Sequence, residues 1–162
     1  MIWQIHSFWA FIIYCVIWLL IHVIVSYVVD RIPSVSFDPK SWLYRGRSFE
    51  RNGELYEAAF RIRYWKHLLP DGAALCGRFR KKTLEKSDSV YIKKFIQETC
   101  RAEMMHWILV AMAAIFFIWN DWWIGLIMIL YALIVNMPCI LAQRFNRIRL
   151  SRIYNHENPN PL

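Results

Sequence analysis

The first 30 residues contain no lysine and no arginine, and neither does the stretch from Trp107 to Leu141. The four cysteines lie 61, 24 and 39 residues apart, which excludes CxxC and zinc-ribbon spacing. The sequence also lacks HExxH, P-loop, GxSxG and HxxxxD patterns. These absences exclude the known zinc-protease, nucleotide-binding and standard acyltransferase motifs.

The residues that are present separate into apolar and basic segments. Of 162 residues, 57% are apolar and nine are tryptophan, yet the formal net charge is +8. An ordinary soluble domain, a disordered chain and a nucleic-acid-binding module do not fit this combination, since soluble chains average roughly 45–50% apolar residues. A basic surface beside long apolar runs indicates an anionic membrane surface, so we expect membrane lipids and no nucleic acid as partners.

The apolar runs predict transmembrane helices. Residues 8–29 carry no formal charge and are long enough to cross a bilayer core. The second apolar run is interrupted at Asn120-Asp121, which predicts two spans over residues 104–119 and 122–142. We therefore expect an all-α integral membrane protein with about three transmembrane helices, forming one membrane domain over residues 1–162.

The basic residues predict the membrane orientation. Sixteen of the 20 lysines and arginines lie in residues 31–102, and the other four lie in residues 143–162. The positive-inside rule places both segments in the cytoplasm, and it places the N-terminus and the turn at Asn120 outside. Three spans satisfy this arrangement, because an odd number of crossings puts the N-terminus and the C-terminus on opposite sides of the membrane.

The cytoplasmic loop over residues 31–102 is expected to lie on the membrane surface. Its residues 50–69 have an amphipathic pattern that predicts an interfacial helix, and residues 88–106 predict another. The C-terminal residues 155–162 are short and rich in proline and asparagine, which predicts a flexible tail.

The first candidate site is the pair Glu103 and His106. The two residues are three apart and so face the same side of a helix, at the point where that helix enters the bilayer. A carboxylate that orients an imidazole raises its basicity, as a general base requires, so we predict both as catalytic residues. A satisfied His–Glu pair at an interfacial helix end is the alternative. Arg101, which has the same spacing from Glu98, is a candidate for substrate binding.

The second candidate is a polar stripe near the end of the last span. Asn136, Gln143 and Arg147 follow helical spacing, and a buried amide in a membrane needs partners. Arg144 extends a basic run that suits a phosphate or carboxylate. We predict these four as substrate-binding residues, with positive-inside anchoring as the alternative for the arginines.

The third candidate is residues 61–72, where cations alternate with aromatic side chains. Trp65, Lys66 and Asp71 are predicted to bind a headgroup, a phosphorylated donor or a sugar. Adhesion to the membrane surface is the alternative for the segment, and shaping of a turn is the alternative for Asp71. His22, alone within the first span, is expected to pack against a helix partner.

Several blocks of residues together resemble a known family. They are Trp65-Lys66-His67 with Asp71-Gly72, Glu98-Thr99 with Arg101, Glu103 and His106-Trp107, and Tyr131 to Leu150 with Asn136, Pro138, Gln143, Arg144 and Arg147. In this order and spacing they resemble the glycosyl-4,4'-diaponeurosporenoate acyltransferase family, over nearly the whole chain. That family is membrane-bound, and it acylates the sugar of a glycosylated carotenoid acid in the last step towards staphyloxanthin-type pigments.

The resemblance implies a membrane acyltransferase that moves a long-chain fatty acyl group onto the sugar hydroxyl of such an acid or of a related glycolipid. The expected co-substrate is acyl-CoA or another acyl thioester, with no cofactor and no metal. In this hypothesis His106 removes the hydroxyl proton, and Asn136 or Gln143 donates to the carbonyl oxygen. Arg144, Arg147 and Lys66 hold the phosphates of the donor.

Two alternatives stay open on the sequence. The chain fits a non-catalytic small membrane partner protein that presents a basic surface. It also fits a metal-dependent lipid hydrolase that uses Glu98, Glu103 and His106. The oligomeric state is not predicted by any of these patterns.

Overall fold

The computed structural model describes residues 7–69 and 89–157, and this part of the chain is helical with no strand. Three of its helices are long and apolar enough to cross a membrane. These are α1 (Ser7–Arg31), α5 (Ser89–Met112) with the 3-10 helix Ala113–Ile118 that follows it, and α6 (Trp122–Glu157). The expected all-α membrane fold with three spans is confirmed.

Two predicted boundaries lie inside longer helices. The polar helix expected over 88–106 and the span expected over 104–119 form one helix, since α5 continues from Ser89 to Met112. Likewise, α6 continues to Glu157, past the expected start of the tail, while residues 158–162 lie outside the described part. At the turn between the spans, the Asn120 amide donates to the carbonyl of Phe116 at 2.9 Å and satisfies a free group at the helix end.

The single amphipathic helix predicted over 50–69 is wrong. Residues Arg51, Asn52 and Gly53 have positive φ angles of 45°, 57° and 94°, and Arg61 has 47°. A right-handed helix cannot pass through left-handed residues. The segment therefore contains α2 (Glu54–Phe60) and α3 (Ile62–Trp65), each followed or preceded by such a break.

The chain divides into two compact units, and α5 and α6 each contribute to both. Unit 1 comprises residues 1–33 and 104–137, and unit 2 comprises residues 34–103 and 138–162. Because two helices continue through the boundary, this division does not test the expectation of a single domain. Each unit has its own core.

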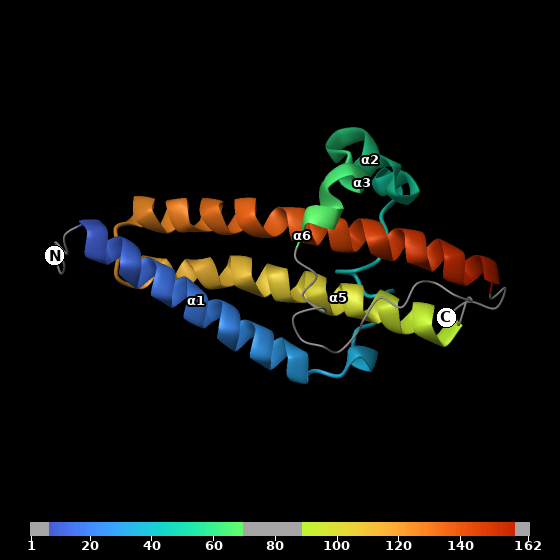
Figure 1. The fold of residues 1–162 in the computed structure, drawn as a ribbon, viewed down its shortest axis with the longest axis horizontal. Coiled ribbons are helices and arrows are strands. Elements are labelled where there is room, and N and C mark those ends of the chain that lie inside the picture. The colour runs from blue at the N-terminus through green and yellow to red at the C-terminus, as the bar shows by residue number, and fades with distance from the viewer. Residues whose placement is uncertain (1–6, 70–88, 158–162) are drawn as a thin grey trace. The chain divides into compact units, whose positions relative to one another are not determined.

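The core of unit 1 is apolar and aromatic. Trp18 on α1 packs with Ala113, Phe116 and Ala132, and the ring centroids of Trp18 and Phe116 are 5.4 Å apart. Figure 1 shows α1 running beside the later part of α5. The outward side chains of α1 are large and exposed, as expected for a helix that faces lipid.

The core of unit 2 joins the short helices to α6. Tyr56 on α2, Ile62 on α3 and Phe145 on α6 form one buried cluster. In Figure 1, α2 and α3 lie against the later part of α6. Unit 2 also contains the buried charged side chains Glu50, Glu103 and Arg147.

Candidate functional site

The imidazole of His106 is hydrogen-bonded to the side chain of Asn136 inside unit 1. Nδ1 of His106 lies 2.8 Å from Oδ1 of Asn136, and Asn136 is 2% exposed. The amide nitrogen of Asn136 donates to the carbonyl of Ala132 at 2.8 Å. Because this bond fixes the amide, Oδ1 is an acceptor and Nδ1 of His106 carries the proton. The lone pair of the ring is then on Nε2, the form that a general base needs.

Helix register in unit 1 follows from contacts at two levels. Trp18 packs with Phe116, while the hydroxyl of Ser26 contacts the sulfur of Met105 at 3.6 Å. A later residue of α1 thus meets an earlier residue of α5, so these helices run antiparallel. His22 lies midway between Trp18 and Ser26, one helical turn from each.

A second imidazole lies at the same level. The hydroxyl of Tyr14 on α1 donates to Asn120, just before α6, at 2.5 Å, and Trp18 on α1 packs with Ala132 on α6, so α1 and α6 run parallel. One turn further along both helices are His22 and Asn136. Nδ1 of His22 lies 2.8 Å from the carbonyl oxygen of Trp18. A carbonyl only accepts, so the His22 lone pair is also on Nε2.

Packing of His22 against a helix partner stays a prediction, and an ionisable residue inside an uncharged span is also a candidate for function. The buried indole Nε1 of Trp18 also has no acceptor among the described residues. Unit 1 therefore holds polar groups that face each other within an otherwise apolar bundle.

Glu103 lies in unit 2, where it binds two arginines. Nη1 of Arg144 donates to one carboxylate oxygen at 2.9 Å, and Nη2 of Arg147 donates to the other at 2.5 Å. Glu103 is fully buried and Arg147 is 3% exposed. Within unit 2, α5 at Glu103 therefore contacts α6 at Arg144 and Arg147.

Arg144 also binds a second buried carboxylate. Its Nη2 donates to Glu50 at 2.8 Å, and the hydroxyl of Tyr56 donates to the same carboxylate oxygen at 2.5 Å. Arg144 further donates to the backbone carbonyl of Leu43 at 3.0 Å. Two arginines and two carboxylates thus balance in charge. Glu50 and Tyr56 were not predicted from the sequence, because their burial depends on a loop whose path the spacing of apolar residues does not reveal.

The polar contacts of this network shift several pKa values. Burial raises the pKa of Glu50, but the hydrogen bonds from Tyr56, the backbone of Arg47 and Arg144 outweigh it and hold the pKa below its usual value. Burial, and then the hydrogen bond to Glu50, raise the pKa of Tyr56 to about 12. Burial likewise raises the pKa of Tyr44 to about 12. Near neutral pH Glu50 is therefore charged, and the phenols of Tyr44 and Tyr56 are neutral.

Three other predicted site residues lie in unit 2, where each contacts another residue of the protein. Arg101 forms an ion pair with Glu98. The indole of Trp65 donates to the carbonyl of Phe60 at 2.7 Å, and Nζ of Lys66 donates to Asn146 at 2.8 Å.

Gln143 is half-buried on α6, and Asp71 lies outside the described residues. Over residues 7–69 and 89–157, no group of three or more histidine, cysteine, aspartate or glutamate side chains has a metal-binding arrangement.

Known proteins match this chain over most of its length. The family described as glycosyl-4,4'-diaponeurosporenoate acyltransferase matches residues 39–156. Proteins of that name from Staphylococcus aureus strains bovine RF122 / ET3-1 and N315 are each 34% identical over 137 residues, which is 84% of this chain and 82% of the relative. No solved structure matches the chain. The chain therefore belongs to the glycosyl-4,4'-diaponeurosporenoate acyltransferase family and is a membrane acyltransferase.

Proposed function

We propose that the protein transfers a long-chain fatty acyl group from an acyl thioester to a sugar hydroxyl of a glycosylated carotenoid acid or related glycolipid. The relatives' name supplies the acceptor class. The observation that carries the proposal is the His106–Asn136 pair, which leaves a basic Nε2 inside an apolar bundle.

In this proposal His106 is the general base. Its Nε2 removes the proton of the sugar hydroxyl as the oxygen attacks the thioester carbonyl carbon. The carbon–sulfur bond then breaks, the thiolate leaves, and the proton on Nε2 passes to that thiolate. The products are the sugar ester and the free thiol.

Asn136 is the positioning residue for this base. Its Oδ1 accepts from Nδ1 of His106, which holds the ring orientation and the tautomer through the proton transfer. One amide hydrogen of Asn136 binds Ala132, so the second is the donor that this proposal assigns to the carbonyl oxygen of the substrate. The sequence predicts that Glu103 orients the His106 ring, whereas this proposal assigns that role to Asn136.

Glu103 then acts indirectly. Its carboxylate neutralises Arg144 and Arg147, two cations that would otherwise be buried without a counter-charge. Because both arginines pair with Glu103, this proposal does not use them to bind the phosphates of the acyl donor. Substrate binding by Gln143, Arg101, Trp65, Lys66 and Asp71 stays a prediction.

We further propose that the loop and the C-terminus face the cytoplasm, with the N-terminus outside. The distribution of lysine and arginine supports this orientation. Apolar tails of both substrates then enter from the same bilayer, which brings two poorly soluble molecules together.

A direct test uses the purified full chain in lipid nanodiscs. A glucosylated carotenoid acid and a long-chain acyl-CoA are added, and the products are analysed by mass spectrometry. The proposal predicts a product heavier than the acceptor by one acyl group. Absence of that product with acyl-CoA and with acyl carrier protein thioesters would favour the non-catalytic partner protein instead.

A further inference from the structure

The basic run at the end of α6 presents two different arginine faces. Arg144 and Arg147, three residues apart, bind the buried carboxylates of unit 2. Arg149 and Arg152 have the same spacing but point to another side of the helix, since two residues along a helix correspond to about 200° of rotation. Neither forms an ion pair with any described residue. The second face is therefore the one with available charge.

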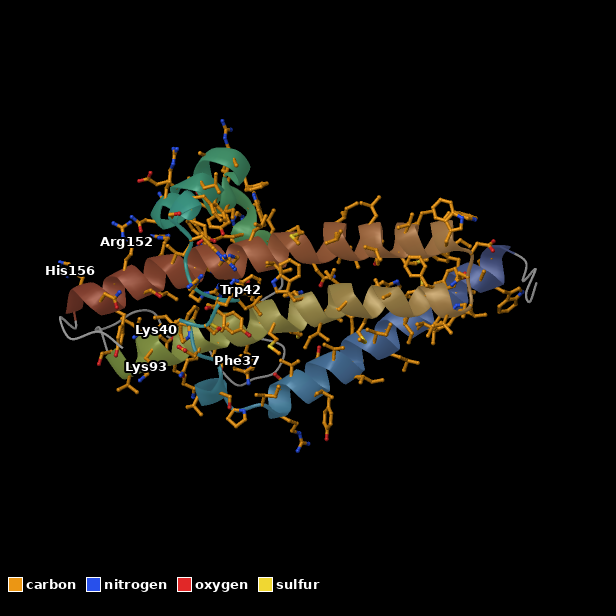
Figure 2. The ribbon with its side chains drawn as sticks, turned by 180° about the vertical axis from the view of Figure 1, so that it is seen from behind. Phe37, Lys40, Trp42, Lys93, Arg152 and His156 are labelled. Atoms are coloured by element: carbon orange, nitrogen blue, oxygen red, sulfur yellow. The ribbon has the colours of Figure 1, made fainter. Side chains whose placement is uncertain are left out.

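This second face lines a groove in unit 2. The groove has a volume of about 420 Å³ and lies against α6, α2 and the turn before α2. Phe145 lines it together with three cations and two carboxylates, which are Arg63, Arg149, Arg152, Glu54 and Glu57. Next to it, Arg149 and Arg152 also line a second hollow with His156. Figure 2 labels Arg152 and His156 on α6, together with Lys40 and Lys93, cations of the same unit that do not line the groove.

One wall of the groove is a strained turn. Asn52 and Gly53 line the groove and belong to three consecutive residues with positive φ angles. Left-handed residues other than glycine are uncommon and cluster at ligand-binding sites. At Gly53, whose φ of 94° favours glycine, an added Cβ would lie 3.5 Å from the Phe145 ring, an ordinary contact distance, so this wall lies directly against Phe145.

The arginines of the groove are placed for an anion. The Arg149 guanidinium lies over the Phe145 ring, 5.5 Å from its centroid. This contact orients the side chain and supplies no negative counter-charge. Arg63 pairs with Glu57 at 3.8 Å, with both side chains substantially exposed, and such a pair is weak. An incoming anion can therefore compete for Arg63.

We propose that this groove binds a phosphate or diphosphate ester group through Arg149 and Arg152, with Arg63 as the third cation. Arginine binds phosphate oxygens in a bidentate manner, and the aromatic floor suits an attached ring or chain. Two sources share this chemistry: the head of a soluble phosphorylated acyl donor, and the headgroup of an anionic lipid. The identification of the bound group as the donor's head rests on the proposed function, whereas phosphate binding does not.

The test measures binding without turnover. Coenzyme A is titrated by calorimetry into the full chain held in nanodiscs of neutral phosphatidylcholine. In parallel, retention of phosphatidylglycerol is measured by native mass spectrometry. The variants are Arg152→Gln, the double variant Arg149→Gln with Arg152→Gln, and Lys40→Gln. Lys40 is an exposed cation of the same unit that does not line the groove.

The proposal predicts that the double variant weakens binding of at least one probe by tenfold or more, and that Arg152→Gln weakens it in the same direction. Lys40→Gln leaves both affinities within twofold. Loss of coenzyme A binding identifies the donor's head, and loss of phosphatidylglycerol alone identifies a lipid headgroup. If both probes bind Arg152→Gln and the double variant as they bind the unmodified chain, the proposal is overturned.

The same experiment separates this site from the catalytic proposal. His106→Gln should bind coenzyme A as the unmodified chain does, because His106 belongs to unit 1. Normal binding with lost turnover in His106→Gln supports both proposals. Unchanged binding in the groove variants, with lost turnover in His106→Gln, overturns the groove alone.

Discussion

Oδ1 of Asn136 accepts from Nδ1 of His106 at 2.8 Å, while the other end of the same amide is tied to the carbonyl of Ala132. A single buried amide thus fixes both the orientation and the tautomer of an imidazole in an apolar bundle. In unit 2, by contrast, the buried carboxylates of Glu50 and Glu103 are paired with arginines. These two arrangements lead to different predictions for substitutions.

Substitution of the amide should impair turnover more than folding. We expect Asn136→Ala to lower kcat by about 10- to 100-fold, because loss of a hydrogen-bond partner that orients a functional imidazole has effects of this order. KM should change little. Asn136→Asp, which keeps an acceptor at the same place, should recover part of kcat. Val135→Ala, an exposed neighbour on α6, is the matched control and should stay within twofold of the unmodified chain.

Removal of the Glu103 charge should impair folding first. Glu103→Gln leaves Arg144 and Arg147 short of a counter-charge in a buried place, which costs about 3–5 kcal/mol. The thermal midpoint in detergent should fall by roughly 10 °C. Glu57→Gln breaks only an exposed pair and should change it by about 2 °C or less. A Glu103→Gln protein with a normal midpoint and no activity would restore Glu103 as the residue that orients His106.

The hydroxyl of Tyr56 should stabilise unit 2. It donates to Glu50 and accepts from Arg144, so Tyr56→Phe leaves buried groups with one partner fewer. We expect a loss of about 1–3 kcal/mol, measured as a lower thermal midpoint. Tyr64→Phe, at an 83% exposed position, should have no effect. Equal midpoints for the two variants would show that the hydroxyl contributes nothing.

The network should also make stability depend on acid pH. The pKa of Glu50 is lowered in the folded chain, so its stabilising contribution is complete above the ordinary glutamate pKa of about 4.3. That contribution is lost as pH falls through the lowered pKa. The thermal midpoint of the unmodified chain should therefore decline below about pH 4.3.

Glu50→Gln provides the control for this pH dependence. It should be less stable at pH 6, and the difference from the unmodified chain should shrink as pH falls. Glu54→Gln, which changes an exposed carboxylate, should follow the unmodified chain at every pH. A constant difference between Glu50→Gln and the unmodified chain from pH 6 to pH 3 would contradict the assignment.

Hydrophobic runs and charge spacing predict the three long helices, because a bilayer imposes strong length and polarity requirements. Helical spacing also placed Glu103 and His106 on one side of a helix, and Asn136 on a polar stripe of the last span. The sequence did not show that Glu103 would bind Arg144 and Arg147 rather than orient His106. That choice depends on where Glu50 and Tyr56 lie, and their path is set by left-handed residues at 51–53. The spacing of apolar residues along the sequence does not reveal such a turn.

The most direct test compares two histidines in the same unit. Acyl transfer by purified His106→Gln and His22→Gln is measured against the unmodified chain, at equal amounts of folded protein. Because general-base catalysis contributes about 10²–10⁴-fold, His106→Gln should lose at least two orders of magnitude in kcat. His22→Gln should retain activity within about tenfold. Full activity in His106→Gln, or loss confined to His22→Gln, would contradict the assignment of His106 as the base.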